Sequence, residues 1–313
     1  MPQKTLPKKI LKDDAGQSGA KTPMTRPFIH RHAGHCESGT MSALLRDRGL
    51  DLSEPMIFGI GCGVFFVYMP YIKMGGIPLI AYRSMPGGII KLVCKRLGIP
   101  LKKMRFRDPD KAKDELDRLL KSGISVGLRT GGFWLPYFPR DMRFQFNAHH
   151  LVVFDKEGDD YKISDPVFEY PVVCSTEDLQ RARFSKGLFA PNGFLFYPER
   201  MPSNPDIKKA VIEGIRFTCR RMIGLPFVPF IGVSGIRLLA RRLKTWPERL
   251  GRDKAISFIG SVVRMQEEIG TGGAGFRFMY TAFLQEAYEI LKTPAVLEAG
   301  SEMSETGDLW REF

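Results

Sequence analysis

The chain has 313 residues, 43% of them hydrophobic and 26% charged, a composition typical of a globular protein long enough for two domains of ordinary size. No apolar run reaches the roughly 18–20 residues of a membrane span, and the basic N-terminus lacks the apolar core and cleavage site of a secretory signal, so we expect a cytoplasmic protein. The formal net charge of +13 favours an acidic partner; no helix-turn-helix, zinc-finger, RRM or KH pattern supports nucleic acid, which leaves an acidic carrier protein or an anionic membrane surface.

The first part of the chain alternates helices and strands after a basic leader. Residues 1–27 carry few large apolar side chains, and we expect them to be disordered. Apolar residues at helical spacing, ending at Gly49, predict a helix over 36–48. The glycine-punctuated segment 57–68 predicts tight turns around a buried stretch. Further predicted elements are strands at 77–83, 124–128, 149–154, 161–164 and 193–197, and helices at 87–97 and 110–121.

Beyond a proline-rich linker at about residues 198–205, the pattern becomes helical. The predicted helices are 207–222, 232–243, 253–269 and 276–291. We therefore predict an α+β fold in which a domain over 28–198 precedes an α-helical domain over 199–295 and a polar, frayed tail over 296–313.

The cysteines do not indicate a disulfide framework. There are five of them, an odd number at irregular spacing and without a Cys-x-x-Cys pair. Apolar or structural neighbours predict that four are small buried hydrophobes: Cys62, Cys94, Cys174 and Cys219. Cys36 differs because it opens a predicted helix, where unpaired backbone amides and the positive end of the helix dipole favour a nucleophilic thiolate. The structural alternative is a buried cysteine that caps the helix.

The histidines point to a partner for this thiol. All five lie in two short segments: His30, His32 and His35 before Cys36, and His149 and His150 at the start of a strand. Strand alternation places His149 and His150 on opposite faces, so only one of them can face the thiol. Asp165 follows the next strand, where its carboxylate would hold the imidazole tautomer and stabilise the charged ring. Structural histidines and a turn-forming Asp before proline are the alternatives.

Three other patterns in the sequence suggest different ligands or partners. The ligands of a zinc site would be His30, His32, His35 and Cys36, but their spacing matches no recognised zinc motif. The glycine-rich segment 270–277 is either a phosphate-binding loop or, as we favour, a tight interhelical turn. The segment 220–244 mixes aromatic and basic residues, which suits peripheral membrane contact, an acidic partner helix, or a helical core with a solvated basic face. We predict no cofactor and no metal, and the oligomeric state is left open.

Several strings, in order along the chain, resemble the butirosin biosynthesis protein H family, whose N-terminal domain has a papain-like fold related to the C39 peptidases. They are His35-Cys36-Glu37-Ser38, the segment 52–61, Leu135-Pro136-Tyr137, and the histidine strand that leads to Asp165-Pro166. The segment 270–287 is similar to the helical domain of unknown function that often follows. The resemblance implies a papain-like (C39-related) cysteine-enzyme domain followed by an α-helical domain.

For activity, the resemblance implies acyl transfer in specialised-metabolite biosynthesis. An acyl or aminoacyl group would pass from an acyl carrier protein thioester to the amine, or hydroxyl, of a small molecule. Cys36 would attack the thioester, His149 would relay the proton and Asp165 would orient the imidazole. C39-type enzymes favour the first histidine of such a strand, which matches His149 better than His150.

The sequence departs from the C39 peptidases at the oxyanion donor. Those enzymes place a glutamine shortly before the cysteine, and none lies between Gln17 and Cys36 here. Backbone amides, or His30 or His32, would have to serve instead. The alternatives to an acyltransferase are a C39-like cysteine amidase or peptidase and a non-catalytic module that binds a carrier or a membrane.

Overall fold

The computed structural model describes residues 27–74, 76–143, 145–224, 227–268 and 272–312. The predicted leader, residues 1–27, therefore lies outside the described residues except for Pro27. The first part contains α1 (Cys36–Asp47), α2 (Glu54–Ile60), β1 (Val64–Met74), β2 (Ile77–Arg83), α3 (Gly88–Arg96), β3 (Leu101–Met104), α4 (Pro109–Lys121), β4 (Val126–Thr130), β5 (His149–Glu157), β6 (Asp160–Ser164), β7 (Val172–Ser175), α5 (Thr176–Arg183) and β8 (Leu195–Pro198). The second contains α6 (Ile207–Ile223), α7 (Gly232–Leu250), α8 (Arg252–Glu267), α9 (Arg277–Leu291) and α10 (Pro294–Arg311).

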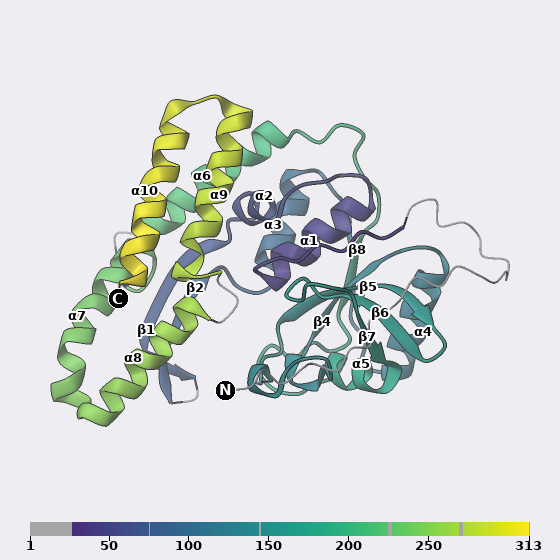
Figure 1. The fold of residues 1–313 in the computed structure, drawn as a ribbon, viewed down its shortest axis with the longest axis horizontal. Coiled ribbons are helices and arrows are strands. Elements are labelled where there is room, and N and C mark those ends of the chain that lie inside the picture. The colour runs from purple at the N-terminus through teal and green to yellow at the C-terminus, as the bar shows by residue number, and fades with distance from the viewer. Residues whose placement is uncertain (1–26, 75, 144, 225–226, 269–271, 313) are drawn as a thin grey trace, which may run out of the picture.

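An antiparallel six-stranded sheet, in the order β3-β8-β4-β5-β6-β7, forms the centre of the first part. Its strands alternate between two apolar cores. Leu151 and Val153 of β5 face a core shared with α4 and α5, whereas Val152 faces the core that contains α1, α2 and α3. The sheet thus lies between α4 and α5 on one side and α1–α3 on the other (Figure 1).

Five strand ends meet at one end of this sheet. Thr130 at the end of β4 pairs with His149 at the start of β5, and β6 ends at Ser164, which pairs with Val152. Leu195 at the start of β8 pairs with Met104 at the end of β3. Residues just beyond these pairs are therefore brought together, although they are far apart in sequence.

The α+β class predicted from the sequence is confirmed, and every predicted helix and strand has a counterpart. The segment 57–68, however, contains most of α2 and the start of β1 rather than a run of turns. Three short elements were not predicted: β3, β7 and α5. Strands of four residues contain too few positions to show a period of two, and α5 has few apolar residues to mark a helical face.

The C-terminal helices pack directly on early parts of the chain. Figure 1 shows the β1–β2 ribbon running alongside them, with α7 and α8 beside the ribbon and α9 beside α2, and both packings appear in the inter-residue contacts. The contact between α2 and α9 is so close that a Cβ on Gly59 would lie 2.1 Å from the ring of Phe283. A single apolar core therefore contains residues of α1–α3 and of α6–α9. The predicted domain boundary near residue 198 does not coincide with a break in packing.

The prediction of a frayed tail over 296–313 is wrong, because most of this segment forms α10. This helix packs on α9 through small residues: a Cβ on Gly307 would lie 2.7 Å from the ring of Phe278. Trp310 stacks its ring under the guanidinium of Arg277 at 3.5 Å and lies edge-on to Tyr82. Helix α10 approaches α9 through glycine rather than through a row of large apolar side chains. Its sequence therefore lacks the apolar stripe by which a packed helix is recognised.

The cysteine prediction holds for three of four positions. Cys62, Cys94 and Cys174 are buried. Cys219 is exposed on α6, as are the nearby residues Phe217 and Arg220. The described residues contain no helix long and apolar enough to cross a membrane.

We predict that Phe283→Ala lowers the free energy of unfolding by about 3 kcal/mol, because it empties a buried ring position between α9 and α2. Since both parts share this core, circular dichroism during urea unfolding is expected to show one transition shifted as a whole. Leu309→Ala, at an exposed position on α10, is the control and is expected to change stability by less than about 0.5 kcal/mol. Two transitions, with the first part unaffected, would contradict the shared core.

Candidate active site

Helix α1 begins at Cys36, and the loop that enters it is held by Glu54. The Glu54 carboxylate accepts the backbone amides of Gly34 and His35, both at 2.8 Å, and the hydroxyl of Ser38 at 3.0 Å. Burial raises the pKa of Glu54, and these three donors oppose that rise. His35 is the N-cap residue, and its Nδ1 lies 2.9 Å from the Ser38 hydroxyl. The backbone on the N-terminal side of the thiol is thus fixed from α2.

Glu37, on the other side of Cys36, is fully buried and compensated by three donors. It pairs with Arg83 at the end of β2 and accepts the amides of Ile89 and Ile90 at 2.9 and 3.2 Å. Arg83 also donates to Nε2 of His35. Burial and the charge of Arg83 hold the pKa of His35 well below its ordinary value, so this imidazole is neutral and suited to accept from Arg83.

The third element of the site is a buried row of hydrogen bonds at the end of the sheet. Nε2 of His149 lies 2.7 Å from Oδ2 of Asp165. The hydroxyl of Tyr137 donates to the same oxygen at 2.9 Å, and the amide of Val167 donates to Oδ1 at 3.3 Å. The ring of Phe138 meets that of His149 edge-on, with centroids 5.2 Å apart. These contacts fix the imidazole in one orientation, with Nδ1 directed away from Asp165.

Close packing brings α1 to this row. A Cβ on Gly39 would lie 2.5 Å from Cβ of Pro166 and 2.7 Å from Cβ of Ala33, so the helix can approach the turn after Asp165 only with a glycine here. The amide of Ala33 also donates to the carbonyl of Pro166 at 2.6 Å. As a result the side chain of Cys36 lies close enough to His149 to contribute to the raised pKa of the imidazole. Nε2 is occupied by Asp165, which leaves Nδ1 for the sulfur.

The surroundings of His149 favour its charged form. Burial by itself would lower the pKa, but the charge and hydrogen bond of Asp165, together with the contact to Cys36, raise the pKa of His149 to about 10. The ring is therefore an imidazolium at neutral pH, next to the thiol. A thiol and a proton donor held in a fixed orientation are the parts of a cysteine-enzyme site.

The remaining candidate residues lie elsewhere. His150 faces the opposite side of the sheet, 6.1 Å from the ring of Phe196, and neither of its ring nitrogens has a hydrogen-bond partner among the described residues. Nε2 of His30 donates to the carbonyl of Phe168 at 3.0 Å, and its Nδ1 lies 2.7 Å from the hydroxyl of Ser164, so His30 supports the turn around Asp165 rather than an oxyanion. His32 is exposed.

The zinc and phosphate-loop alternatives find no support in these positions. Within the described part of the chain, no group of three or more His, Cys, Asp or Glu side chains could hold a metal ion. In the glycine-rich segment, residues 272–277 form an interhelical turn in which the amide of Ala274 donates to Glu267 at 3.1 Å. Phe276 of this turn packs on Phe58 and, edge-on at 5.1 Å, on His35. The second part of the chain therefore touches the cap of the helix that carries Cys36.

Sequence reasoning missed four residues that hold the site together: Glu37, Glu54, Arg83 and Tyr137. Glu37, Glu54 and Tyr137 lie within the strings that resemble the butirosin family, which is the one signal that could have selected them. Arg83 carries no local signal, since a strand that ends in arginine is common.

Residues 35–166 match the family described as "Butirosin biosynthesis protein H, N-terminal", and residues 177–313 match the "Domain of unknown function (DUF4872)". Among solved structures, the chain is similar to a putative C39-like peptidase from Bacillus anthracis, with 17% sequence identity and a TM-score of 0.38 over 56% of this chain and 96% of that one. The search of curated proteins gives no match.

We predict that Asp165→Asn weakens the pH dependence of stability. The folded pKa of His149, about 10, lies above its unfolded value of 6.5. Its charge therefore stabilises the fold fully below pH 6.5, and this contribution is lost as the pH rises toward 10. Urea unfolding measured between about pH 6 and about pH 10 gives the free energy of unfolding at each pH. This free energy is expected to fall more in the wild type than in the variant, by on the order of 2 kcal/mol. Equal slopes for both proteins would contradict a charged His149.

Proposed function

We propose that this chain, whose residues 35–166 belong to the butirosin biosynthesis protein H N-terminal family and whose residues 177–313 belong to the domain of unknown function (DUF4872), is a cysteine-dependent acyltransferase. The donor is an acyl or aminoacyl thioester on an acyl carrier protein, and the acceptor is an amine, or less favourably a hydroxyl, of a small molecule. The observation that carries this proposal is the buried row of Cys36, His149 and Asp165, in which the imidazole is charged and faces the sulfur.

In the first half-reaction, the Cys36 sulfur attacks the thioester carbonyl. A new bond joins the acyl carbon to the Cys36 sulfur, the carbon–sulfur bond of the donor breaks, and the carrier sulfur leaves with the proton of His149. In the second half-reaction, neutral His149 takes a proton from the acceptor amine as it attacks the acyl carbon. The Cys36 sulfur is then released and the charged pair with His149 is restored.

Asp165 and Tyr137 act through His149 as positioning residues. The carboxylate accepts from Nε2 of the ring, which keeps Nδ1 directed to the sulfur in both half-reactions. The hydroxyl of Tyr137 and the amide of Val167 hold the carboxylate in turn. This support keeps the reacting groups aligned without a rearrangement at each step.

The backbone supplies one candidate for the oxyanion donor. The amides of Gly34 and His35 are taken by Glu54, whereas the amide of Cys36, at the first helical position, has no acceptor among the described residues. It lies at the positive end of α1, where a developing negative charge is stabilised. A thioester is already activated, so its reaction needs less stabilisation of the oxyanion than cleavage of a peptide bond does. A single backbone donor therefore suits acyl transfer better than proteolysis.

Two further features support transfer and a carrier-bound donor. Cys36 and His149 are only 8% and 6% exposed, which limits access of bulk water to an acyl-enzyme and favours transfer over hydrolysis. The net charge of +13 favours encounter with an acidic carrier protein. Cytoplasmic localisation belongs to the same proposal, since acyl carrier proteins act there.

We predict that wild-type protein gains the mass of the acyl group when it is incubated with acyl carrier or acyl-coenzyme A thioesters, and that Cys36→Ala does not. Intact-protein mass spectrometry measures this directly. Addition of an amine is expected to discharge the adduct and to give the amide, whereas discharge by water alone would identify a hydrolase. No adduct from any donor would remove the support for a nucleophilic Cys36 and favour a binding module.

A second prediction separates the two adjacent histidines. His149→Ala is expected to slow acyl-enzyme formation by about 10³-fold, because it removes the proton donor for the leaving sulfur. His150→Gln, which alters a buried ring on the opposite face of the sheet, is expected to retain the rate within about fivefold. Rapid-quench mass spectrometry gives both rates, and circular dichroism checks that both variants fold. Equal losses would show that His149 has no special role.

A further inference from the structure

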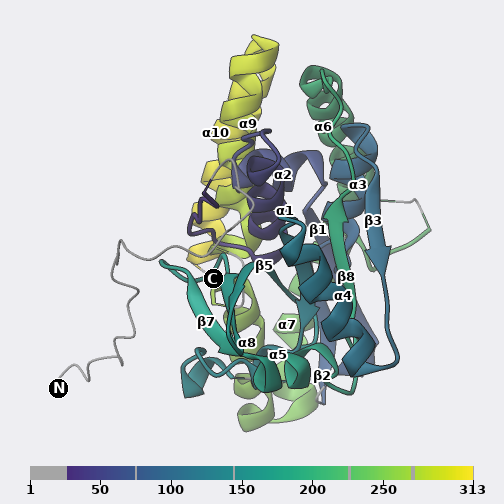
Figure 2. The same ribbon diagram turned by 90° about the vertical axis from the view of Figure 1, so that its right-hand side faces the viewer.

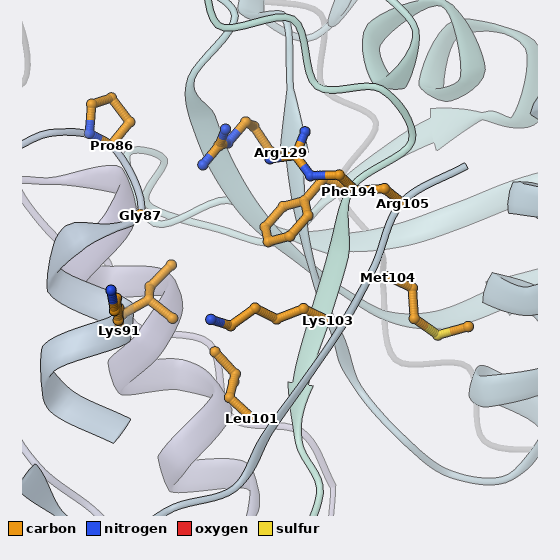
Figure 3. Close-up of a pocket in the computed structure, with 10 residues that line it drawn as sticks. Pro86, Gly87, Lys91, Leu101, Lys103, Met104, Arg105, Arg129 and Phe194 are labelled. Atoms are coloured by element: carbon orange, nitrogen blue, oxygen red, sulfur yellow. The ribbon is translucent and has the colours of Figure 1, made fainter. Parts of the chain in front are cut away.

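A cavity of about 510 Å³ lies on the side of the sheet covered by α1–α3. Its walls come from the start of α3, from β3 and the residue after it, from Arg129 of β4 and from Phe194, which precedes β8. Figure 3 shows Lys103 extending from the β3 side toward Lys91 on α3, with Arg129 and the ring of Phe194 above them. The volume is within the range of small-molecule sites.

The charged residues that line this cavity are all cations: Lys91, Lys103, Arg105 and Arg129. Among the described residues, none of them forms a salt bridge. The charge of the buried carboxylate of Glu37 reaches Arg129, but its hydrogen bonds are taken by Arg83 and the amides of Ile89 and Ile90. The cavity is therefore lined by four cations and by no carboxylate.

Arg129 is the strongest indication that an anion belongs here. It is only 9% exposed, and its Nε has no hydrogen-bond partner in the described part of the chain. Arg129 and Arg105 both stack on the ring of Phe194, with guanidinium carbons 5.1 and 5.0 Å from the ring centre. Burial and the charge of Arg105 lower the pKa of Arg129. Holding two guanidinium groups on one ring without a counter-ion is costly, and a bound anion would remove that cost.

The cavity and the thiol are at the same end of the sheet. Arg129 pairs with His150 on β5, the residue next to His149, and Phe194 immediately precedes β8 on the other side of β4. Because Arg129 shares a face of the sheet with its partner His150, the cavity lies on the face opposite that of His149, and it extends from β4 to β3, one to three strand spacings or roughly 5–15 Å from β5. Glu37, the neighbour of Cys36, bonds to the amide of Ile90, which also lines the cavity.

We propose that this cavity binds the phosphate of the pantetheine arm that carries the acyl group of the donor. The proposal rests on the proposed function, since a carrier-bound or coenzyme A thioester ends in this arm. The forked guanidinium of Arg129 suits two phosphate oxygens, and Lys91 and Lys103 supply point charges from the facing wall. The thioester sulfur at the other end of the arm then extends toward Cys36.

The test compares two probes that differ only in the phosphate: 4′-phosphopantetheine and pantetheine, titrated calorimetrically into the wild-type protein under reducing conditions. We expect pantetheine to bind at least about tenfold more weakly, and Lys103→Ala to weaken 4′-phosphopantetheine by about five- to tenfold. Lys91→Ala is a second variant with the same expectation. Lys102→Ala is the matched control, because Lys102 is the adjacent residue of β3 but acts on Glu115 of α4 rather than on the cavity.

The proposal is overturned if the two probes bind equally or if Lys102→Ala and Lys103→Ala have the same effect. Inorganic phosphate distinguishes the donor arm from free phosphate: binding as tight as that of 4′-phosphopantetheine, without inhibition of acylation, would also overturn it. The proposed function is judged separately by acyl-enzyme formation. If the wild type is acylated but binding does not depend on Lys103, only the phosphate site is wrong; if binding depends on Lys103 but no thioester acylates Cys36, only the proposed acyl transfer is wrong.

Discussion

A carboxylate that is fully removed from water needs its charge compensated within the protein, and Glu37 of α1 meets this need with three donors from two other elements. Arg83 ends β2, the amides of Ile89 and Ile90 begin α3, and Glu37 itself is in the first turn of α1. Because the next residue toward the N-terminus is Cys36, this charge network fixes the helix start that carries the thiol. Arg83 extends the same network to the cap residue His35.

The second half of the site depends on close packing rather than charge. Gly39 lets α1 meet the turn at Pro166, and that turn carries Asp165 against His149. The charge on His149 is then stabilised by a buried carboxylate whose other contacts, from Tyr137 and Val167, are also hydrogen bonds. An imidazolium in this position can donate its proton to a leaving sulfur, and the neutral imidazole that remains can take one from an amine, which is what acyl transfer requires.

The C-terminal helices contact the residues that hold the candidate site in place. Phe276 packs on His35 and Phe58, and Phe283 fills the space left by Gly59. Since α2 also carries Glu54, which holds the loop before Cys36, the C-terminal helices stabilise the start of α1 through α2. The two family matches therefore describe segments that share one core, and the arrangement explains why α2, β1 and β2 cannot be assigned to the first part alone.

By itself the sequence determined the α+β class, most helices and strands, and a short set of candidates: a cysteine at a helix start, two histidines on opposite faces of a strand, and an acid after the next strand. Those features are local, because periodicity and helix boundaries depend on near neighbours. The resemblance to a known family favoured His149 over His150 as the partner of Cys36. Only the tertiary structure decided that Asp165 and Cys36 both contact His149, that Tyr137, Glu54 and Arg83 support them, and that Lys91, Lys103, Arg105 and Arg129 surround one cavity. Such contacts join residues separated by tens of positions, and they depend on strand register and on close approach at Gly39, which no local pattern encodes.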